Sequence, residues 1–486
     1  MNDVNGKMTD AEVAGFVREF ERRTGVFVQR VRGTAVWQLI RFEVAVRIQG
    51  LSLERAPVGR GRVLGSLVRG FVRFFGLKRA PYLCKTFDSA YRRETPDGVD
   101  DIYFDDLKPV MPGMVKMSSC DAVGYEQRMA RASTPPVFDD TAVIALSAIL
   151  GRVLPVAVRS PAFDAISRAI GGELGFGDYT PARIRRVYNV FWWRVLLYRL
   201  VLWRVRPKAV LCPDNGQFGL MRAAAQAGIP YIEMQHGVFT HAHPNALPPD
   251  LSAAEATGLL VPTVFAVYGA FSADVLQASW LHLNDRVRPV GAPFLERARA
   301  ERAAHFRPGG VPRLTLSTQG IARQALGDFI ASFLQLCEAT FELVIKLHPA
   351  YDGDQDFYAQ RFGKDPRVVI EPGTSAIGTD TLIARSDLHI SISSACHYDA
   401  LGIGTPTGIL ALETHEAMAD LLGVPGACLI ATPADLAGLV RNRAFGVVPE
   451  QTSRYFFERD FPGRVEALLE SLGAAPDAPD KDTVAA

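Results

Sequence analysis

The stretch "KAVLCPDNGQFGLMRAAAQAGIPYIEMQHG", residues 208–237, decides the fold class. It opens with a short apolar run that ends in the polar turn "PDNG", which is typical of a buried strand and its exit. The segment "FGLMRAAAQAG" then has helix-forming residues and a terminal glycine, and "YIEM" is a second apolar run. A strand, a helix and a strand in this order predict two parallel strands joined by a right-handed crossover.

The same alternation continues along the chain and then starts again. "TVFAVYGAF" at 263–271 and "RVRPVGAPF" at 286–294 are apolar runs that lead into a glycine. From "RLTLSTQG" at 313–320 onward, short apolar runs alternate with helical segments. Two halves rich in βαβ units predict an α/β protein with two doubly wound Rossmann-like domains facing across a cleft.

Composition places the domain boundaries. A charged segment followed by Gly and Pro at 297–313 predicts the linker between the halves. We expect a first domain at 1–300 with a helical N-terminal elaboration, and a second at 301–445. The stretch 446–472 is interpreted as one helix that crosses back to the first domain, and the tail 473–486 as disordered.

Length and composition exclude several classes of protein. The 486 residues carry a net charge of +1, which does not favour a nucleic-acid binder. Six scattered cysteines without a CxxC pair favour neither a disulfide scaffold nor a zinc site and fit a reducing cytosol. The longest apolar run, at 143–158, is interrupted by Arg152 and Pro155 and is too short to span a membrane.

The basic charge is concentrated near the start of the chain. Residues 1–80 hold 15 Lys and Arg against 7 Asp and Glu. Within them, residues 60–79 interleave cationic and apolar side chains, which is typical of a surface that contacts a membrane. We expect a cytoplasmic protein, with peripheral contact at the inner face of the cytoplasmic membrane as an open alternative, and no nucleic-acid partner.

The strands of the second half end in groups suited to a phosphate. Ligands of open α/β sheets bind beyond the carboxyl ends of the strands. "KLHP" ends one strand, and its proline predicts the first turn of a helix whose N–H groups would face an anion. Alone, each of the motifs "TQG", "KLHP" and "SISS" is better explained as a strand end or a helix cap. Together they predict a nucleotide site formed by Gln319, Gly320, Lys346, His348, Pro349, Ser393, Ser394 and Asp399.

The usual nucleotide fingerprints are missing. No GxGxxG follows a strand, and no GxxxxGK[ST] occurs. The sequence therefore predicts neither a dinucleotide-binding Rossmann enzyme nor a P-loop NTPase.

Between Lys208 and Val440 the chain resembles a known group of enzymes. The order "PYIEMQHGVF", "FAVYGAF", "VRPVGAPF", "LTLSTQG", "VIKLHPAY", "SDLHISISSACHYDALGIGTP" is similar to bacterial GT-B glycosyltransferases of capsule and lipopolysaccharide assembly. That group is similar to sialyl- and polysialyltransferases, Kdo transferases and, more distantly, CDP-glycerol glycerophosphotransferases. The resemblance is specific for the superfamily and not for the sugar.

The resemblance implies a role for several residues. His348, Ser393 and Ser394 would contact the phosphate of the donor nucleotide. The acidic residue on the next helix, commonly Glu in these enzymes, would contact the ribose, and here it is the shorter Asp399. These enzymes generally need no metal to bind the donor. We therefore expect no metal and no resident cofactor, with the nucleotide-sugar as a co-substrate.

Polar residues also end the strands of the first half. Gln235, His236 and Gly237 follow "YIEM", where the resemblance implies the acceptor side of the cleft. Histidine is a natural base near neutral pH, but a ligand contact or a structural role for His236 remains equally open. Asp214, after "VLCP", and Asp88, after "LCKTF", are competing bases.

Two patterns suggest a metal, but each has a simpler explanation. "YDGDQD" at 351–356 has DxD spacing, yet acids at a helix start suit the helix dipole. His241 and His243 have no cysteine or acidic cluster beside them.

We therefore expect an inverting glycosyltransferase that transfers a sugar from a nucleotide-sugar to a glycan or lipid-linked glycan. A CDP-polyol phosphotransferase and a non-catalytic glycan- or nucleotide-binding subunit remain alternatives.

Overall fold

The computed structural model describes residues 10–50, 60–87, 92–95, 98–119, 129–214, 216–239, 246–276, 279–280, 285–349, 351–375 and 377–474, and gives the backbone alone at 60–64, 66 and 92–95. The chain forms two compact units. Unit 1 comprises Met1–Val267, Ser272–Arg288 and Pro462–Ala486, and unit 2 comprises Tyr268–Phe271 and Pro289–Phe461.

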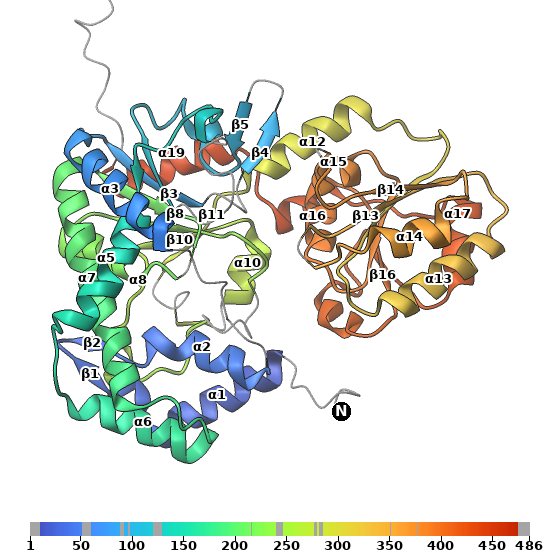
Figure 1. The fold of residues 1–486 in the computed structure, drawn as a ribbon. Helices are drawn as coiled ribbons and strands as arrows, with labels where there is room; N and C mark the ends of the chain where they lie inside the picture. The colour runs from blue at the N-terminus through green and yellow to red at the C-terminus, as the bar shows by residue number, and fades with distance from the viewer. Residues whose placement is uncertain are drawn as a thin grey trace, which may run out of the picture. The chain divides into compact units, whose positions relative to one another are not determined.

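Unit 1 is built on a seven-stranded sheet (Figure 1). Its strands are β3 (Tyr82–Phe87), β6 (Val115–Ser119), β7 (Phe138–Asp139), β8 (Ala209–Cys212), β9 (Tyr231–Met234), β10 (Val264–Val267) and β11 (Val287–Pro289). They lie in the order β11-β10-β9-β8-β3-β6-β7, and the pairings from β10 to β7 are parallel. The strand order reverses between β3 and β8, which makes this the topological switch point of the sheet.

Helices cover this sheet. They include α3 (Arg60–Gly76), α5 (Thr141–Val153), α7 (Pro181–Val205) and α8 (Phe218–Gln226). α7 buries Val195, Tyr198 and Leu202 in one cluster with Leu83 of β3 and Val210 of β8. α6 (Pro161–Leu174) lies between α5 and α7 in the chain, so residues 141–206 are mainly helical.

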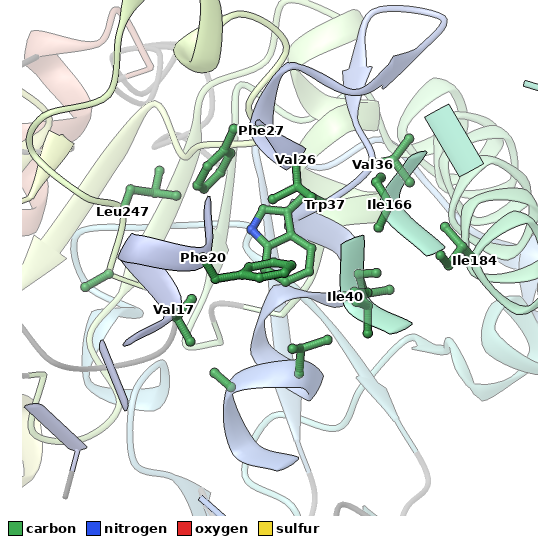
Figure 2. Packing of buried hydrophobic residues seen from close by; sticks show 14 of the residues in the cluster. Val17, Phe20, Val26, Phe27, Val36, Trp37, Ile40, Ile166, Ile184 and Leu247 are labelled. Carbon is green, nitrogen blue, oxygen red and sulfur yellow. The ribbon is translucent and has the colours of Figure 1, made fainter. Parts of the chain in front are cut away.

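The N-terminal elaboration is only partly helical. α1 (Asp10–Thr24) and α2 (Gln38–Ile48) flank η1 (Val26–Val28) and a hairpin of β1 (Arg30–Val31) and β2 (Thr34–Ala35). Figure 2 shows Trp37 packed among Phe20, Val26 and Ile40. Its indole N–H donates to Glu21 Oε1 at 2.8 Å, and this buried carboxylate also accepts from Arg41 at 2.6 Å. Unit 1 also contains β4 (Arg92–Thr95), β5 (Gly98–Asp101), η2 (Asp105–Leu107) and α9 (Ala253–Ala256).

Unit 2 has a six-stranded, fully parallel sheet. Its strands are β12 (Arg313–Ser317), β13 (Glu342–Lys346), β14 (Val368–Glu371), β15 (Leu388–Ser391), β16 (Thr407–Leu410) and β17 (Ala427–Ile430). They lie in the order β14-β13-β12-β15-β16-β17, with the switch point between β12 and β15. The connecting helices are α13 (Arg323–Leu336), α14 (Gln355–Phe362), α15 (Thr379–Ala384), α16 (Cys396–Ile403), η4 (His415–Leu421) and α17 (Pro433–Asn442).

The expected linker at 297–313 is mostly helix. α12 (Pro293–His305) belongs to unit 2, and the chain passes from unit 1 to unit 2 after Arg288. Arg302 donates to the carbonyls of Ala384 and Ser386 at 3.0 and 2.8 Å, which fastens α12 to the end of α15. These contacts explain why a segment of linker-like composition is ordered.

The single helix expected at 446–472 is wrong. The chain forms α18 (Glu450–Phe456) in unit 2 and α19 (Phe461–Ser471), almost all of which belongs to unit 1. Asp460 between them has a left-handed φ of 59°, which interrupts the helix, and Pro462 lies in the first turn of α19, where a proline is tolerated. α10 (Ala270–Val275) completes the set of elements. The tail predicted as disordered lies, from residue 475, outside the described residues.

The predicted fold class, two doubly wound Rossmann-like α/β domains in series, is confirmed by the two parallel sheets. No helix in the described part of the chain is long and apolar enough to cross a membrane.

Candidate functional site

The switch point of unit 2 is held together by side chains predicted for nucleotide binding. The N–H of Ser393, just after β15, donates to Oε1 of Gln319, just after β12, at 3.1 Å. Two residues earlier in each segment, the Ser391 hydroxyl donates to the Ser317 carbonyl at 2.7 Å. The structure therefore brings Gln319 and Ser393 together, although 74 residues separate them.

Hydroxyl groups surround the start of α16 at this edge. Ser394 is buried, and its Oγ accepts from the Cys396 N–H at 3.2 Å, as expected of a helix cap. The half-buried Ser393 hydroxyl lies 2.8 Å from Thr414 Oγ1, which follows β16. Thr414 was not among the residues predicted from the sequence. These groups and the N-terminal dipole of α16 create an environment that favours an anion.

His348 is fixed as a neutral hydrogen-bond donor. Its Nδ1 accepts from the Tyr351 N–H at 3.1 Å, so the neutral ring carries its proton on Nε2. The ring stacks on Tyr351 with 4.6 Å between centroids. Burial lowers the pKa of His348 below its usual range, although Asp352 opposes the shift. At neutral pH this side chain would therefore donate a hydrogen bond to a phosphate rather than pair with it as a cation.

Lys346 and Pro349 are placed differently from what their sequence suggests. The buried Lys346 ammonium donates to the Pro372 carbonyl at 2.8 Å and to Ser375 Oγ at 2.7 Å, which holds the loop after β14. The helix start predicted at Pro349 is wrong, because α14 begins only at Gln355. Pro349 is exposed in the loop between β13 and α14.

Gly320 is required by a close approach of two loops. It has a φ of +70°, and a Cβ at this position would lie 2.2 Å from the Tyr351 carbonyl oxygen. The loop after β12 therefore passes directly against the loop after β13 that holds His348. Only glycine fits this contact without displacing the backbone.

Asp399 lies in the first turn of α16 and is half-buried. Burial, together with Asp380 at the start of α15, raises its pKa to about 7. Close to neutral pH the carboxyl can therefore donate or accept a hydrogen bond, and both options suit a ribose hydroxyl.

The DxD pattern after His348 is occupied by contacts within unit 2. Asp352 is fully buried between Arg323, at 3.0 Å, and the Tyr358 hydroxyl, at 2.7 Å. Asp354 caps α14 by accepting from the Phe357 N–H at 3.1 Å. This fits the structural interpretation of the motif. No group of three or more His, Cys, Asp or Glu gathers as metal ligands among the described residues, and His241 and His243 lie outside them.

The switch point of unit 1 carries Asp214, which follows β8. Its carboxylate accepts from the Gly216 N–H at 2.8 Å and from the Gln217 side-chain amide at 2.7 Å. These bonds orient the carboxylate in front of α8. Asp88, which follows the neighbouring strand β3, lies outside the described residues.

The QHG motif ends the next strand, β9. Gln235 is buried, and its side-chain amide donates to the Gly237 carbonyl at 2.8 Å, so it shapes the turn. His236 and Gly237 are exposed. No atom of the described residues lies within 4 Å of a Cβ placed on Gly237, so none of them requires glycine there. Desolvation lowers the pKa of His236, while the negative charge of Asp214 opposes the shift.

Glu233 is the residue at this edge that the sequence analysis missed. It lies on β9 opposite Cys212 of β8 and is 5 % exposed. Burial and the nearby Asp214 raise its pKa to about 8. A carboxyl in the middle of the apolar run "YIEM" was the available signal, since such a group is rarely buried without a reason. Unit 1 thus gathers two carboxyls and an imidazole at one edge.

A second buried polar cluster lies deeper in unit 1. Lys85 of β3 is fully buried and donates to Ser119 Oγ at 2.6 Å and to Asp140 at 2.9 Å. The Tyr198 hydroxyl of α7 donates to the same carboxylate at 2.7 Å. The groups satisfy one another, so this cluster joins the strands to α7 rather than forming a binding site.

Comparisons with known proteins identify similar folds only. No protein-family model and no curated protein matches the chain. A UDP-GlcNAc 2-epimerase from Neisseria meningitidis, in a structure with UDP-GlcNAc bound, is 14% identical with a TM-score of 0.47, over 80% of this chain and 99% of that one. MurG of Acinetobacter baumannii is 12% identical, with a TM-score of 0.43 over 81% and 99%. The wall teichoic acid polymerase TagF is 9% identical, with a TM-score of 0.42 over 85% and 98%. These values are too low for the activity of those proteins to be transferred to this chain.

Proposed function

We propose that the protein is a glycosyltransferase that moves a sugar from a nucleotide-sugar donor to a glycan or lipid-linked glycan acceptor, with inversion and without a metal. Unit 2 would bind the donor, and unit 1 would bind the acceptor and supply the base. The similarity of the motifs to bacterial enzymes of capsule and lipopolysaccharide assembly suggests a surface glycan as product.

One observation carries the proposal: the convergence of phosphate-compatible groups at the switch point of unit 2. Gln319 and Ser393 are hydrogen-bonded to each other there, and the Gly320 contact brings the His348 loop to the same place. Hydroxyls, an imidazole Nε2–H and a helix N-terminus can all donate hydrogen bonds to a diphosphate. Asp399 on α16 would receive the ribose.

The chemistry would follow from these placements. The acceptor hydroxyl oxygen forms a bond to the anomeric carbon while the bond from that carbon to the donor phosphate breaks. The electron pair leaves with the phosphate, whose charge the unit 2 groups stabilise. The hydroxyl proton passes to His236, whose lowered pKa keeps the ring neutral and able to accept it. Asp214 would stabilise the imidazolium that results.

The test is a thermal-shift panel with CMP, CDP, UDP, GDP and dTDP. A nucleotide that binds the folded protein raises its melting temperature by mass action. We expect one nucleotide to stabilise the protein and His348→Ala to abolish that shift. His305→Ala is the matched control, because His305 is an exposed histidine of α12, away from the strand ends.

The identity of the nucleotide sharpens the result. CMP would indicate a sugar acid such as sialic acid or Kdo, and UDP, GDP or dTDP an ordinary hexose. CDP would favour the polyol-phosphate transferase, in which attack occurs at phosphorus. Stabilisation without turnover on any acceptor would favour a non-catalytic subunit, and no stabilisation by any nucleotide would overturn the donor site.

A further inference from the structure

One face of α3 exposes a continuous apolar stripe. Val68, Phe71, Val72 and Phe75 follow the i, i+3, i+4, i+7 spacing of one helix face, and their exposure ranges from 58% at Val68 to 67% at Phe71. The rings of Phe71 and Phe75 contact each other edge to face, 5.0 Å apart. Single exposed apolar residues are ordinary, but an aligned stripe with two phenylalanines marks an interaction surface.

The packing of α3 explains why this stripe points outward. Gly70, on the opposite face, lies against α5 so closely that a Cβ would meet the Ala142 Cβ at 2.2 Å. Phe74 packs against the core cluster of unit 1. α3, α5 and α7 lie side by side on this part of unit 1 (Figure 1). The inner face of α3 is therefore used by the fold, while the stripe stays exposed within the part of the chain that the structure describes.

A cationic pocket continues the surface at the end of α3. The pocket has a volume of ≈ 320 Å³ and is lined by Leu77, Lys78, Arg79, Trp203, Arg204 and Arg206. Its two sides are joined by backbone hydrogen bonds from Ala80 to Val205, at 3.0 Å, and from Lys208 to Pro81, at 2.8 Å. Arg204 also donates to the Phe75 carbonyl at 3.0 Å. The pocket is thus a fixed part of unit 1, beside the apolar stripe.

The charge of this surface has one sign. No Asp or Glu occurs in residues 55–87 or in residues 181–208, the segments that contain α3, α7 and the pocket. The exposed Trp203 adds an aromatic ring among the cations. Aromatic and aliphatic side chains bordered by Lys and Arg match the interface of an anionic bilayer, where apolar groups enter the acyl boundary and cations meet phosphates.

We propose that this surface, the α3–α7 face, formed by Val68, Phe71, Val72, Phe75 and the six pocket residues, docks the protein on an anionic lipid bilayer. A second copy of the chain is a poor occupant, because symmetric contact would oppose like charges. A nucleic acid would leave the apolar stripe without a partner.

The α3–α7 face is separate from the candidate site of unit 1. Leu77–Arg79 precede β3 and Arg204–Arg206 precede β8, so the pocket lies at the amino ends of these strands. Asp214 and His236 follow the carboxyl ends of β8 and β9, at the opposite edge of the sheet. Docking would therefore leave the edge with Asp214 and His236 uncovered, and it does not depend on nucleotide binding.

The experiment is co-sedimentation of the full chain with vesicles. We expect binding to vesicles of phosphatidylglycerol and phosphatidylcholine in equal parts, and weak binding to phosphatidylcholine alone. Salt at roughly 0.5 M should weaken the binding, because the Debye length then falls to a few Å. Absence of binding to the anionic vesicles at low salt would overturn the proposal.

Matched variants identify the face. Phe71→Ser with Phe75→Ser should lower the partition coefficient by roughly a hundredfold, since the burial of each ring contributes about a factor of ten. Arg79→Glu with Arg204→Glu should abolish the preference for anionic lipid. Val447→Ser and Arg307→Glu, which make an apolar-to-serine and an arginine-to-glutamate change at exposed residues of unit 2, should bind like the parent.

The remaining outcomes also decide the proposal. Equal melting temperatures for all variants would show that folding is intact. If the face variants bind vesicles like the parent, or if the parent prefers RNA or heparin to anionic vesicles, the proposal is wrong. A failed nucleotide panel with retained vesicle binding would reject the proposed function alone.

Discussion

The two units share one topology but present different chemistry at their switch points. In unit 2 the groups that meet at the strand ends are Gln319, the serines and a neutral His348, partly bonded to one another, and the carboxyl of Asp399 lies one turn into α16. In unit 1 the corresponding edge carries Asp214, Glu233 and His236, and the charge of Asp214 helps to raise the pKa of Glu233 and opposes the lowering of the pKa of His236. A doubly wound sheet therefore fixes where a site lies, while the residues at the strand ends decide what it does.

This difference fits phosphate binding in unit 2 and proton transfer in unit 1. Preorganised hydrogen-bond donors around a helix N-terminus can bind a phosphate without themselves changing charge. A carboxyl pair beside an imidazole can instead hold and release a proton close to neutral pH. Each of the following predictions alters one side of this comparison and leaves the other as the control.

The largest effect is expected from His236→Ala. If His236 takes the acceptor proton, the transfer rate should fall by about 10²–10⁴-fold, the usual range for a general base. The nucleotide-induced thermal shift should be unchanged, because the donor groups belong to unit 2. Steady-state rates and thermal shifts on the same samples check this.

Asp214→Asn separates the two candidate bases. We expect a smaller loss than for His236→Ala, because Asp214 is already bound by Gly216 and Gln217. A full transfer rate in His236→Ala together with an inactive Asp214→Asn would assign the base to Asp214.

A smaller effect is expected from Glu233→Gln, on stability. The pKa of Glu233 is about 8 in the folded protein and 4.5 ordinarily, so the folded state keeps a proton that the unfolded state releases. Stability should therefore fall as the pH rises from about 4.5 through 8 and level off above. At about 1.4 kcal/mol per pKa unit, the loss is a few kcal/mol.

The variant removes this titration. Between pH 5 and pH 8.5, the melting temperature of Glu233→Gln should fall by less than that of the parent. Glu338→Gln, at an exposed glutamate, should follow the parent. Parallel curves for all three proteins would show that Glu233 is not protonated in the folded state.

The sequence predicted the fold because its signal is local. Short apolar runs, helical segments and glycines reveal each βαβ unit, and parallel pairing then determines which strand ends meet. That is why Gln319 and Ser393 could be placed at one edge without coordinates. The composition of residues 297–313 predicted a linker, but much of this segment belongs to the helix α12. That helix is held by Arg302, which donates to carbonyls more than 80 residues away.

Side-chain direction was the part that sequence could not provide. Lys346 has the charge for a phosphate, but its ammonium points into the loop after β14. The role of Glu233 could not be predicted from the sequence. The alternation of side chains along a strand assigns each residue to one face of the sheet, but it does not show which residues of other strands lie beside it. Its neighbour Asp214 comes from another strand, and only the packed structure reveals the pair.

The last prediction compares two glycines with nearly the same backbone, of which Gly228 should show the smallest effect. Gly320 and Gly228 have φ of +70° and +68°, so alanine should cost each about 1–2 kcal/mol of left-handed strain. Only at Gly320 would the new Cβ also meet a carbonyl oxygen, that of Tyr351, at 2.2 Å. Because the Tyr351 N–H fixes the His348 ring, moving this loop should disturb the donor site. We therefore expect a clearly larger loss of melting temperature in Gly320→Ala than in Gly228→Ala, and a lost nucleotide shift only in Gly320→Ala. A nucleotide shift that survives in Gly320→Ala would mean that the contact between the two loops stabilises unit 2 without shaping its ligand site.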